Sequence, residues 1–159
     1  MTPLDGQQRL TTLFLLHYYI AKHEDIDATE YDFLKNFTYE TRESSKSFCS
    51  HLVAFAPDFS KSTLSEQIQD EAWFLLEWEN DPTVLSMLVM LDSIHKLFSE
   101  TYGLWSKLMS DNIVFYFLPI NDMGLTDELY IKMNSRGTLL SDFEILKAEL
   151  QMKKNGEKL

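Results

Sequence analysis

Residues 5–22, DGQQRLTTLFLLHYYIAK, indicate that this chain is built on helices. Apolar positions recur every three or four residues along the stretch, which is the spacing of one buried face of an α-helix. This face comprises Leu10, Leu13, Phe14, His17 and Ile20. Asp5, followed three residues later by Gln8, forms a capping box, which marks a helix start. The stretch therefore predicts a helix over about residues 6–22.

A second strong helix signal lies at Asp81 and Pro82. Aspartate suits the cap of a helix and proline suits its first position. The apolar stripe that follows predicts a core-facing helix and comprises Val84, Met87, Leu88, Leu91, Ile94 and Phe98. Shorter helices are predicted from Ser44 or Ser45 to about Phe55, near residues 68–76, near 102–109, and over 141–153, where Ser141 and Glu144 form another capping box.

Two segments indicate strands. Residues 37–42 alternate between Phe37, Tyr39 and more polar neighbours, and residues 113–118 form a continuous apolar run. Residues 128–135 fit either a helix or a strand. The predicted fold class is therefore α+β, predominantly α-helical, with two or three short strands. We expect a single domain over residues 1–153, followed by a frayed tail over residues 154–159.

Composition narrows the class of protein. With 45% hydrophobic and 13% aromatic residues, the chain has ample material for a packed core. The 25 acidic residues outnumber the 14 basic ones, and the net charge of -11 argues against a broad DNA-binding face, although a small basic pocket stays open. No apolar run approaches the ~20 residues of a membrane span, and the first residues lack the features of a signal peptide. The single cysteine, Cys49, excludes an internal disulfide, so we expect a cytoplasmic protein without a membrane partner.

The first motif with chemical potential is Asp5-Gly6-Gln7-Gln8-Arg9. It lies on the first turn of the predicted helix, where backbone N–H groups and the helix dipole favour anions. Gly6 permits close approach of a ligand, the two glutamines can donate to oxygens, and Arg9 can pair with a phosphate through two bonds. These are the parts of a phosphate or nucleotide cradle. The alternative is a capped helix whose first turn is simply solvated.

The second motif covers residues 128–144 and centres on Asn134, Ser135 and Arg136. These side chains stand beside Gly137 and a new helix start, which together make a corner rich in hydrogen-bond donors. The alternative is helix punctuation, in which Arg136 complements a helix C-terminus and Gly137 supplies a left-handed turn.

Taken together and in this order, the two motifs resemble a known family. Residues 5–13, DGQQRLTTL, are similar to the hallmark of the N-terminal domain of GmrSD-type restriction endonucleases, which is a ParB-like nucleotide-binding domain. Residues 39–45 (YETRESS), 73–74 (WF) and 81–83 (DPT) are similar to recurring words of a branch of this family, and residues 129–148 are similar to its closing segment. The resemblance spans nearly the whole chain.

The resemblance implies a function and a site. Members of the family bind and hydrolyse nucleoside triphosphates and couple this reaction to the cutting of modified foreign DNA. It implies that Gly6, Gln7, Gln8 and Arg9 line a site for GTP, ATP or CTP, and that Asn134, Ser135 and Arg136 lie nearby. Asp5 either caps its helix or holds Mg²⁺ through water. If turnover occurs, Arg9 would stabilise phosphate charge and Asp5 would hold the metal or water, which makes these two the catalytic candidates.

The chain also departs from the family pattern. Members carry a strand motif before DGQQR and a separate His-Asn-His nuclease after the domain, whereas this sequence begins just before DGQQR and its four histidines are scattered. We therefore expect a partial ParB-like module that binds nucleotide rather than turning it over, and whether it is an enzyme stays open. Its expected partners are a nuclease module or subunit, DNA only indirectly, and further copies of itself. The alternative is a non-catalytic helical scaffold or protein-interaction module of a defence complex.

Several residues are predicted to be structural. Trp73, Trp78 and Trp105 should belong to the core, because the basic residues that accompany base-stacking platforms are sparse. Cys49 should be a buried, inert thiol. His17 should have a core role and His95 an ordinary hydrogen bond. Glu40 and Arg42 should form a surface ion pair or support a pocket.

Overall fold

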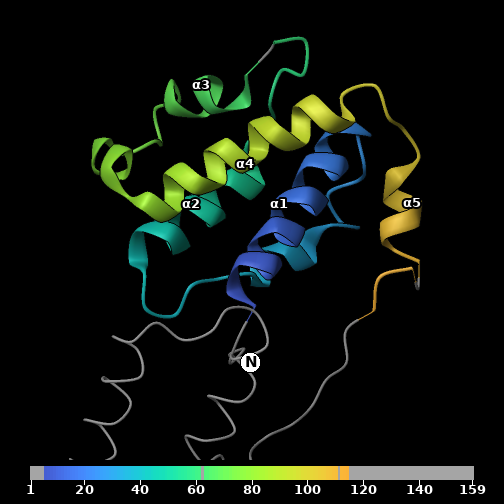
Figure 1. Cartoon of the computed structure of the whole chain (residues 1–159), viewed down its shortest axis with the longest axis horizontal. Helices are drawn as coiled ribbons and strands as arrows, with labels where there is room; N and C mark the ends of the chain where they lie inside the picture. The colour runs from blue at the N-terminus through green and yellow to red at the C-terminus, as the bar shows by residue number, and fades with distance from the viewer. Residues whose placement is uncertain (1–5, 62, 111, 115–159) are drawn as a thin grey trace, which may run out of the picture. The chain divides into compact units, whose positions relative to one another are not determined.

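The computed structural model describes residues 6–61, 63–110 and 112–114 (Figure 1). Its elements follow in the order α1 (Gln7–His23), η1 (Asp32–Asn36), α2 (Glu43–Ala54), α3 (Leu64–Gln69), η2 (Leu76–Asn80), α4 (Pro82–Phe98) and α5 (Leu104–Leu108), where η marks a 3-10 helix. The predominantly α-helical prediction is confirmed for these residues. The prediction of one domain over residues 1–153 with a tail over 154–159 extends beyond them and stays a prediction.

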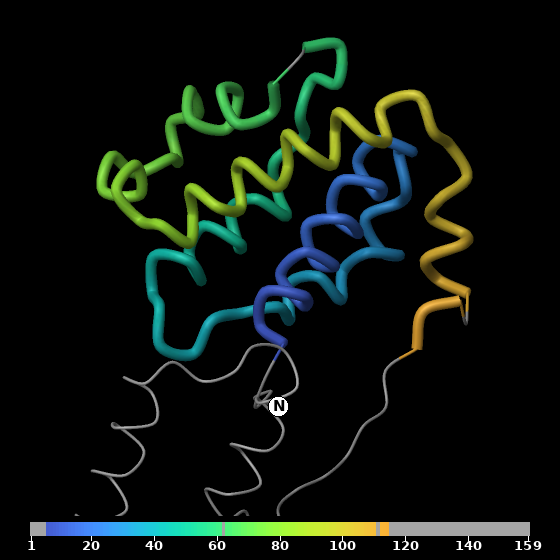
Figure 2. The backbone as a smooth tube through the Cα atoms, in the orientation of Figure 1, coloured from blue at the N-terminus to red at the C-terminus, as the bar shows by residue number. Residues whose placement is uncertain are grey.

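Helix α4 organises the core. It contacts α1, α2, α3 and η2, and the tube in Figure 2 shows it running beside α1 while α5 lies along α1 farther on. The predicted stripe on α4 is confirmed, because all of its residues from Val84 to Ile94 are buried and Phe98 is half-buried. The largest fully buried side chains from the other elements include Trp78, Tyr19, Phe48 and Leu52. The core is therefore aromatic-rich and centred on one long helix.

Helix α1 confirms the first predicted element but buries a wider face. The buried residues are Phe14, Leu15, Tyr18, Tyr19, Ile20 and Ala21, whereas Leu10, Leu13 and His17 are half-buried. The reason is that α1 is covered on more than one side, by α4, α5 and η1. The helix begins at Gln7 with Gly6 as its cap, one residue later than the capping box predicts. Asp5 lies outside the described residues.

The short strand predicted over residues 37–42 is wrong. The segment contains no strand, and none occurs elsewhere in residues 6–61, 63–110 and 112–114. Its alternation has another cause, because Phe37 and Tyr39 pack on the core while Thr38 and Glu40 are exposed. Two aromatic anchors thus hold an extended segment without a pairing partner. The other strand candidates, residues 113–118 and 128–135, lie mostly or wholly outside the described residues, so the α+β class stays unsupported.

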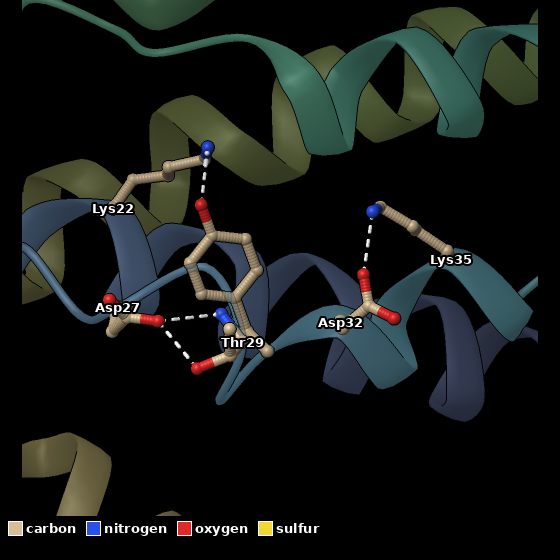
Figure 3. A network of polar contacts seen from close by, with 6 residues as sticks. Lys22, Asp27, Thr29, Asp32 and Lys35 are labelled. Carbon is tan, nitrogen blue, oxygen red and sulfur yellow. Dashed lines mark hydrogen bonds and ion pairs between the residues drawn. The ribbon is translucent and has the colours of Figure 1, made fainter.

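A polar network shapes the connection from α1 to η1 (Figure 3). The Lys22 ammonium donates to the Tyr31 hydroxyl at 3.0 Å, at the end of α1. The Asp27 carboxylate accepts from the backbone N–H of Thr29 at 2.9 Å, which tightens the turn. Lys35 and Asp32 form an exposed ion pair at 2.6 Å within η1. These local contacts direct the chain back toward the start of α1.

The tryptophan and cysteine predictions are confirmed. Trp78 and Trp105 are buried, and Trp73 packs half-buried against the core. Cys49 is buried, and burial raises the pKa of its thiol to about 12, which makes it unreactive at neutral pH. Across the described part of the chain, no helix is both long and apolar enough to cross a membrane.

Candidate functional site

Two adjoining hollows lie at the beginning of α1. The first has a volume of about 610 Å³ and is bounded by the start of α1 and the segment from Asn36 to Lys46. The second, of about 490 Å³, lies between α1 and the first half of α4. Gln7, Thr11, Tyr39 and Arg42 border both hollows, which we call together the groove. Both volumes fall within the ~300–1,000 Å³ range of small-molecule sites.

One wall of the groove is the 37–42 segment, which is fastened to α1. The Thr11 and Tyr39 hydroxyls share a hydrogen bond of 2.6 Å, and the Phe14 and Phe37 rings stack with centroids 4.4 Å apart. Burial raises the pKa of Tyr39 despite the opposing effect of the Thr11 bond, so the phenol is neutral at physiological pH. Thr11 also donates to the Gln7 carbonyl at 2.9 Å, which ties the wall to the first helical turn.

Asp81 fastens the start of α4 to the start of α2. Its carboxylate accepts from the backbone N–H groups of Thr83 at 2.7 Å and Val84 at 3.3 Å, as the predicted helix cap requires. It also accepts from the Ser44 hydroxyl. Helix α2 thus begins before Ser44 and Ser45, the predicted starting residues, because Arg42 occupies the cap position and the Ser44 hydroxyl donates across to Asp81 at the start of α4.

The charge of Asp81 is favoured by this setting. Partial burial acts to raise the pKa of its carboxyl, but the hydrogen bonds that it accepts and the nearby Arg42 charge outweigh that effect. The pKa therefore lies below its usual range. Asp81 consequently remains a carboxylate that supports the groove from behind.

Two cations face the groove. Arg42 borders both hollows and donates to the Thr83 hydroxyl, while Lys46 borders the first hollow and lies 3.6 Å from Glu43. Glu40 also borders the first hollow. A local group of cations thus exists on a chain whose net charge is -11, as the sequence leaves open.

The first turn of α1 carries its own special geometry. Gly6 has φ +88°, in the left-handed region, and caps the helix. A Cβ atom at this position would lie 3.4 Å from Nη2 and 3.6 Å from Nε of Arg9, so the guanidinium of Arg9 folds over Gly6. The backbone N–H groups of this turn point out of the helix end, which favours an anion there.

The comparison with protein families completes these observations. The model of the family described as the GmrSD restriction endonuclease, N-terminal domain, matches residues 1–151 of the 159-residue chain. The chain belongs to this family. Comparisons with curated proteins and with solved structures gave no match. Membership links this GmrSD domain to a restriction system that contains a nuclease, and so to a defence role.

Of the residues predicted for the site of this GmrSD domain, the structure describes those at the start of α1. Gln7 and Gln8 are exposed and border the groove, while Gly6 and Arg9 lie at the helix start beside it. Four predicted site residues, Asp5, Asn134, Ser135 and Arg136, lie outside the described residues. Within the described ranges, no group of three or more His, Cys, Asp or Glu side chains is arranged to hold a metal ion.

Sequence reasoning missed Thr11, Tyr39 and Lys46 as neighbours of the motif. Thr11 and Tyr39 stand within the words DGQQRLTTL and YETRESS, so the signal was present, but their contact joins residues 28 positions apart. The predicted hydrogen-bond role of His95 is confirmed, with the Tyr19 hydroxyl at 3.0 Å and the Lys61 carbonyl at 3.1 Å as partners.

Proposed function

We propose that this GmrSD domain is the nucleotide-binding module of a modification-dependent restriction system, and that the groove is its nucleoside triphosphate site. One observation carries the proposal: Gln7 of the DGQQR motif borders two hollows of small-molecule size together with Arg42, and Lys46 borders the first of them and Gln8 the second. Amide donors, cations and an open helix start are the groups that bind phosphate oxygens.

The chemistry assigned to the motif follows from the first turn of α1. Phosphate oxygens would accept from its backbone N–H groups and from the side chains of Gln7 and Arg9, while Gln8, which borders the second hollow, would contact the rest of the nucleotide. Asp5 would hold Mg²⁺ through water, and Asn134, Ser135 and Arg136 of the closing motif would be further nucleotide contacts. Any turnover would be metal-assisted hydrolysis, in which Arg9 stabilises the developing phosphate charge. Cutting of DNA would belong to a nuclease module or subunit, and the expected location is the cytoplasm, where foreign DNA is met.

A calorimetric titration with GTP, ATP and CTP, each with and without Mg²⁺, tests the proposal. We expect one nucleotide to bind in the presence of Mg²⁺ and the Arg9→Ala variant to lose this binding while its melting temperature changes little. Arg9 is exposed, so its removal should leave the core intact. Binding that is unchanged in Arg9→Ala would remove Arg9 from the site.

The second candidate function is a non-catalytic scaffold, either for a nuclease partner or for further copies of the chain. It is favoured by apolar side chains exposed on α4, with Val89 66% and Leu97 71% exposed. Val89 and Leu97 are eight residues apart on one helix and so lie near one face, and apolar faces left open to solvent often mark protein contacts when they form a contiguous patch. Absence of heat with every nucleotide, together with sedimentation as a dimer or larger assembly, would support the scaffold. A monomer at high concentration would count against self-association.

A further inference from the structure

The two ends of the groove differ in chemistry. The first hollow is bordered by three charged side chains, Arg42, Lys46 and Glu40, and by hydroxyls and apolar groups, among them Thr38, Thr41, Leu10 and Phe37. The second hollow has fewer charged side chains and is bordered by two methionines, Met87 and Met90, together with polar groups such as Gln8, Thr12, Thr83 and Ser86. Arg42 borders both, so it stands where the two hollows meet. A ligand with one anionic end and one flat apolar end would match this asymmetry.

We propose that a nucleotide lies along the groove in one direction, with its phosphates in the first hollow against Arg42 and Lys46 and its base in the second hollow against Met87 and Met90. This inference rests on the proposed function and adds to it the direction of the ligand and four residues outside the DGQQR motif. Arg42, at the junction, contacts the phosphates nearer the ribose, and Lys46 contacts the terminal phosphate.

Arg42 is suited to this role by its bonding. Its guanidinium has five N–H donors in a planar fork, and a single neutral acceptor, the Thr83 hydroxyl, accounts for one of them in the hollow. The bond to Thr83 holds the fork at the mouth of both hollows. A phosphate is the stronger acceptor because the bond becomes charge-assisted at both ends.

Lys46 is held loosely enough to change partners. Its ammonium lies 3.6 Å from the Glu43 carboxylate, and the two side chains are 50% and 83% exposed. Exposed ion pairs of this kind contribute little to folding stability. The Lys46 ammonium can therefore leave Glu43 and bind a multiply charged phosphate instead. Glu40 borders the same hollow, and Mg²⁺ bound to the phosphates would lessen their repulsion by its carboxylate.

The apolar end is formed by α4. Met87 is buried and forms part of the floor, while Met90 is half-buried at the side. Methionine side chains are flexible and polarisable, and they make favourable contacts with aromatic rings. Leu15, buried on α1, lies beneath the same hollow. A base placed here would lie against the exposed part of Met90, above the buried Met87 and Leu15.

Affinities for the mono-, di- and triphosphate of the nucleotide that binds, measured with Mg²⁺ at about 0.15 M salt, test the direction. In the unmodified chain we expect affinity to rise with each phosphate. Lys46→Ala should lower triphosphate affinity about tenfold and leave monophosphate affinity nearly unchanged, as loss of one charge-assisted contact predicts. Arg42→Ala should lower both di- and triphosphate affinity, and Arg42→Lys should restore part of the loss. Met90→Ala should instead lower all three affinities by the same factor.

Lys35→Ala is the matched control. Lys35 is an exposed lysine paired with an acid three residues earlier, as Lys46 is, but it does not border the groove. It should leave all three affinities unchanged, and melting curves should show that every variant is folded. An equal loss for all three phosphates in Lys46→Ala, or a loss confined to the triphosphate in Met90→Ala, would overturn the direction. If the Arg42, Lys46 and Met90 variants all bind the nucleotide as tightly as the unmodified chain, this inference alone is overturned. If the unmodified chain binds no nucleotide, the proposed function is overturned as well.

Discussion

Two glycines, Gly6 and Gly103, cap helices in the left-handed backbone region, with φ of +88° and +73°. An alanine in this region costs about 1 kcal/mol. The surroundings of the two positions differ, because a Cβ at Gly6 meets the Arg9 guanidinium at 3.4 Å and one at Gly103 meets nothing within 4 Å. Comparing alanine substitutions at the two glycines therefore distinguishes the effect of backbone strain from the effect of disturbing the DGQQR motif.

We expect Gly6→Ala and Gly103→Ala each to lower the free energy of unfolding by about 1 kcal/mol, measured by urea denaturation. Only Gly6→Ala should also weaken nucleotide binding in calorimetry, because it alone alters the helix start and Arg9. If Gly103→Ala weakens binding equally, the effect comes from lost stability and Gly6 has no special role.

Asp81 combines a helix cap with a link to α2, so its removal should lower stability more than the removal of an exposed carboxylate. Asp81→Ala should lower the free energy of unfolding by about 1–2 kcal/mol at pH 7, since it removes a cap and leaves the Ser44 hydroxyl without this acceptor. The control Asp70→Ala, at an exposed position after α3, should change stability by less than about 0.5 kcal/mol.

The same residue predicts a pH dependence. The folded-state pKa of Asp81 lies below its usual range, so its contribution is fully present above the unfolded value of about 4. It is lost as the pH falls through that value toward the lower folded pKa. The stability difference between the unmodified chain and Asp81→Ala should therefore narrow between pH 6 and pH 3. A difference that stays constant would mean that the bonds of Asp81 do not depend on its charge.

At the scale of elements, the sequence predicts what is encoded locally. Helices α1 and α4 follow from apolar spacing, and Asp81 with Pro82 marks the start of α4 correctly. The segment over residues 37–42 is predicted wrongly because alternation reports which side chains are buried, and not whether a backbone finds a partner strand. Side-chain burial and strand pairing are separate properties, and the sequence of one short segment reports only the burial.

The groove could not be predicted for a related reason. Its walls depend on contacts between distant residues, such as Thr11 with Tyr39 and Ser44 with Asp81, which are 28 and 37 positions apart. The DGQQR motif predicted the helix start and its donors, but the cations opposite come from α2 and the residues before it. The sequence motif therefore identifies the residues on one side of the groove, whereas the residues on the other side are brought there by tertiary packing.

Helix α5 shows how a short element depends on a distant residue. Its five residues are too few to be stable alone, and Gly103 offers no side-chain cap. The carboxylate of Glu24, at the end of α1, accepts from the N–H groups of Leu104 at 2.7 Å and Trp105 at 3.3 Å. Glu24 thus caps α5 from 80 positions away.

Glu24→Ala should loosen α5 while leaving the core in place. We expect amide hydrogen exchange over residues 104–108 to accelerate at least about tenfold, because a charge-assisted cap is lost, and exchange in α4 to stay slow. Glu77→Ala, at an exposed position on η2, should leave exchange in α5 unchanged. Acceleration throughout α4 as well would show that α5 and the core open as one unit.

For the whole molecule, the contrast between global and local charge decides which anions can bind. The net charge of -11 repels polyanions over distances up to about a Debye length, whereas Arg42 and Lys46 act only within the groove. A nucleotide is small enough to place its phosphates wholly against these two cations. A DNA duplex presents a long row of phosphates, most of which would lie beyond these two cations and be repelled by the net negative charge of the chain.

This contrast predicts that the chain alone does not hold duplex DNA. In fluorescence anisotropy with a labelled duplex, we expect no measurable affinity at either 50 or 200 mM salt, with or without the nucleotide that binds in the groove. A protein that neutralises several phosphates loses affinity by orders of magnitude over this salt range, so a steep salt dependence would reveal a basic face formed elsewhere in the chain. Nucleotide binding without DNA binding would support the proposal that this chain binds nucleotide and that DNA is contacted by a nuclease module or subunit.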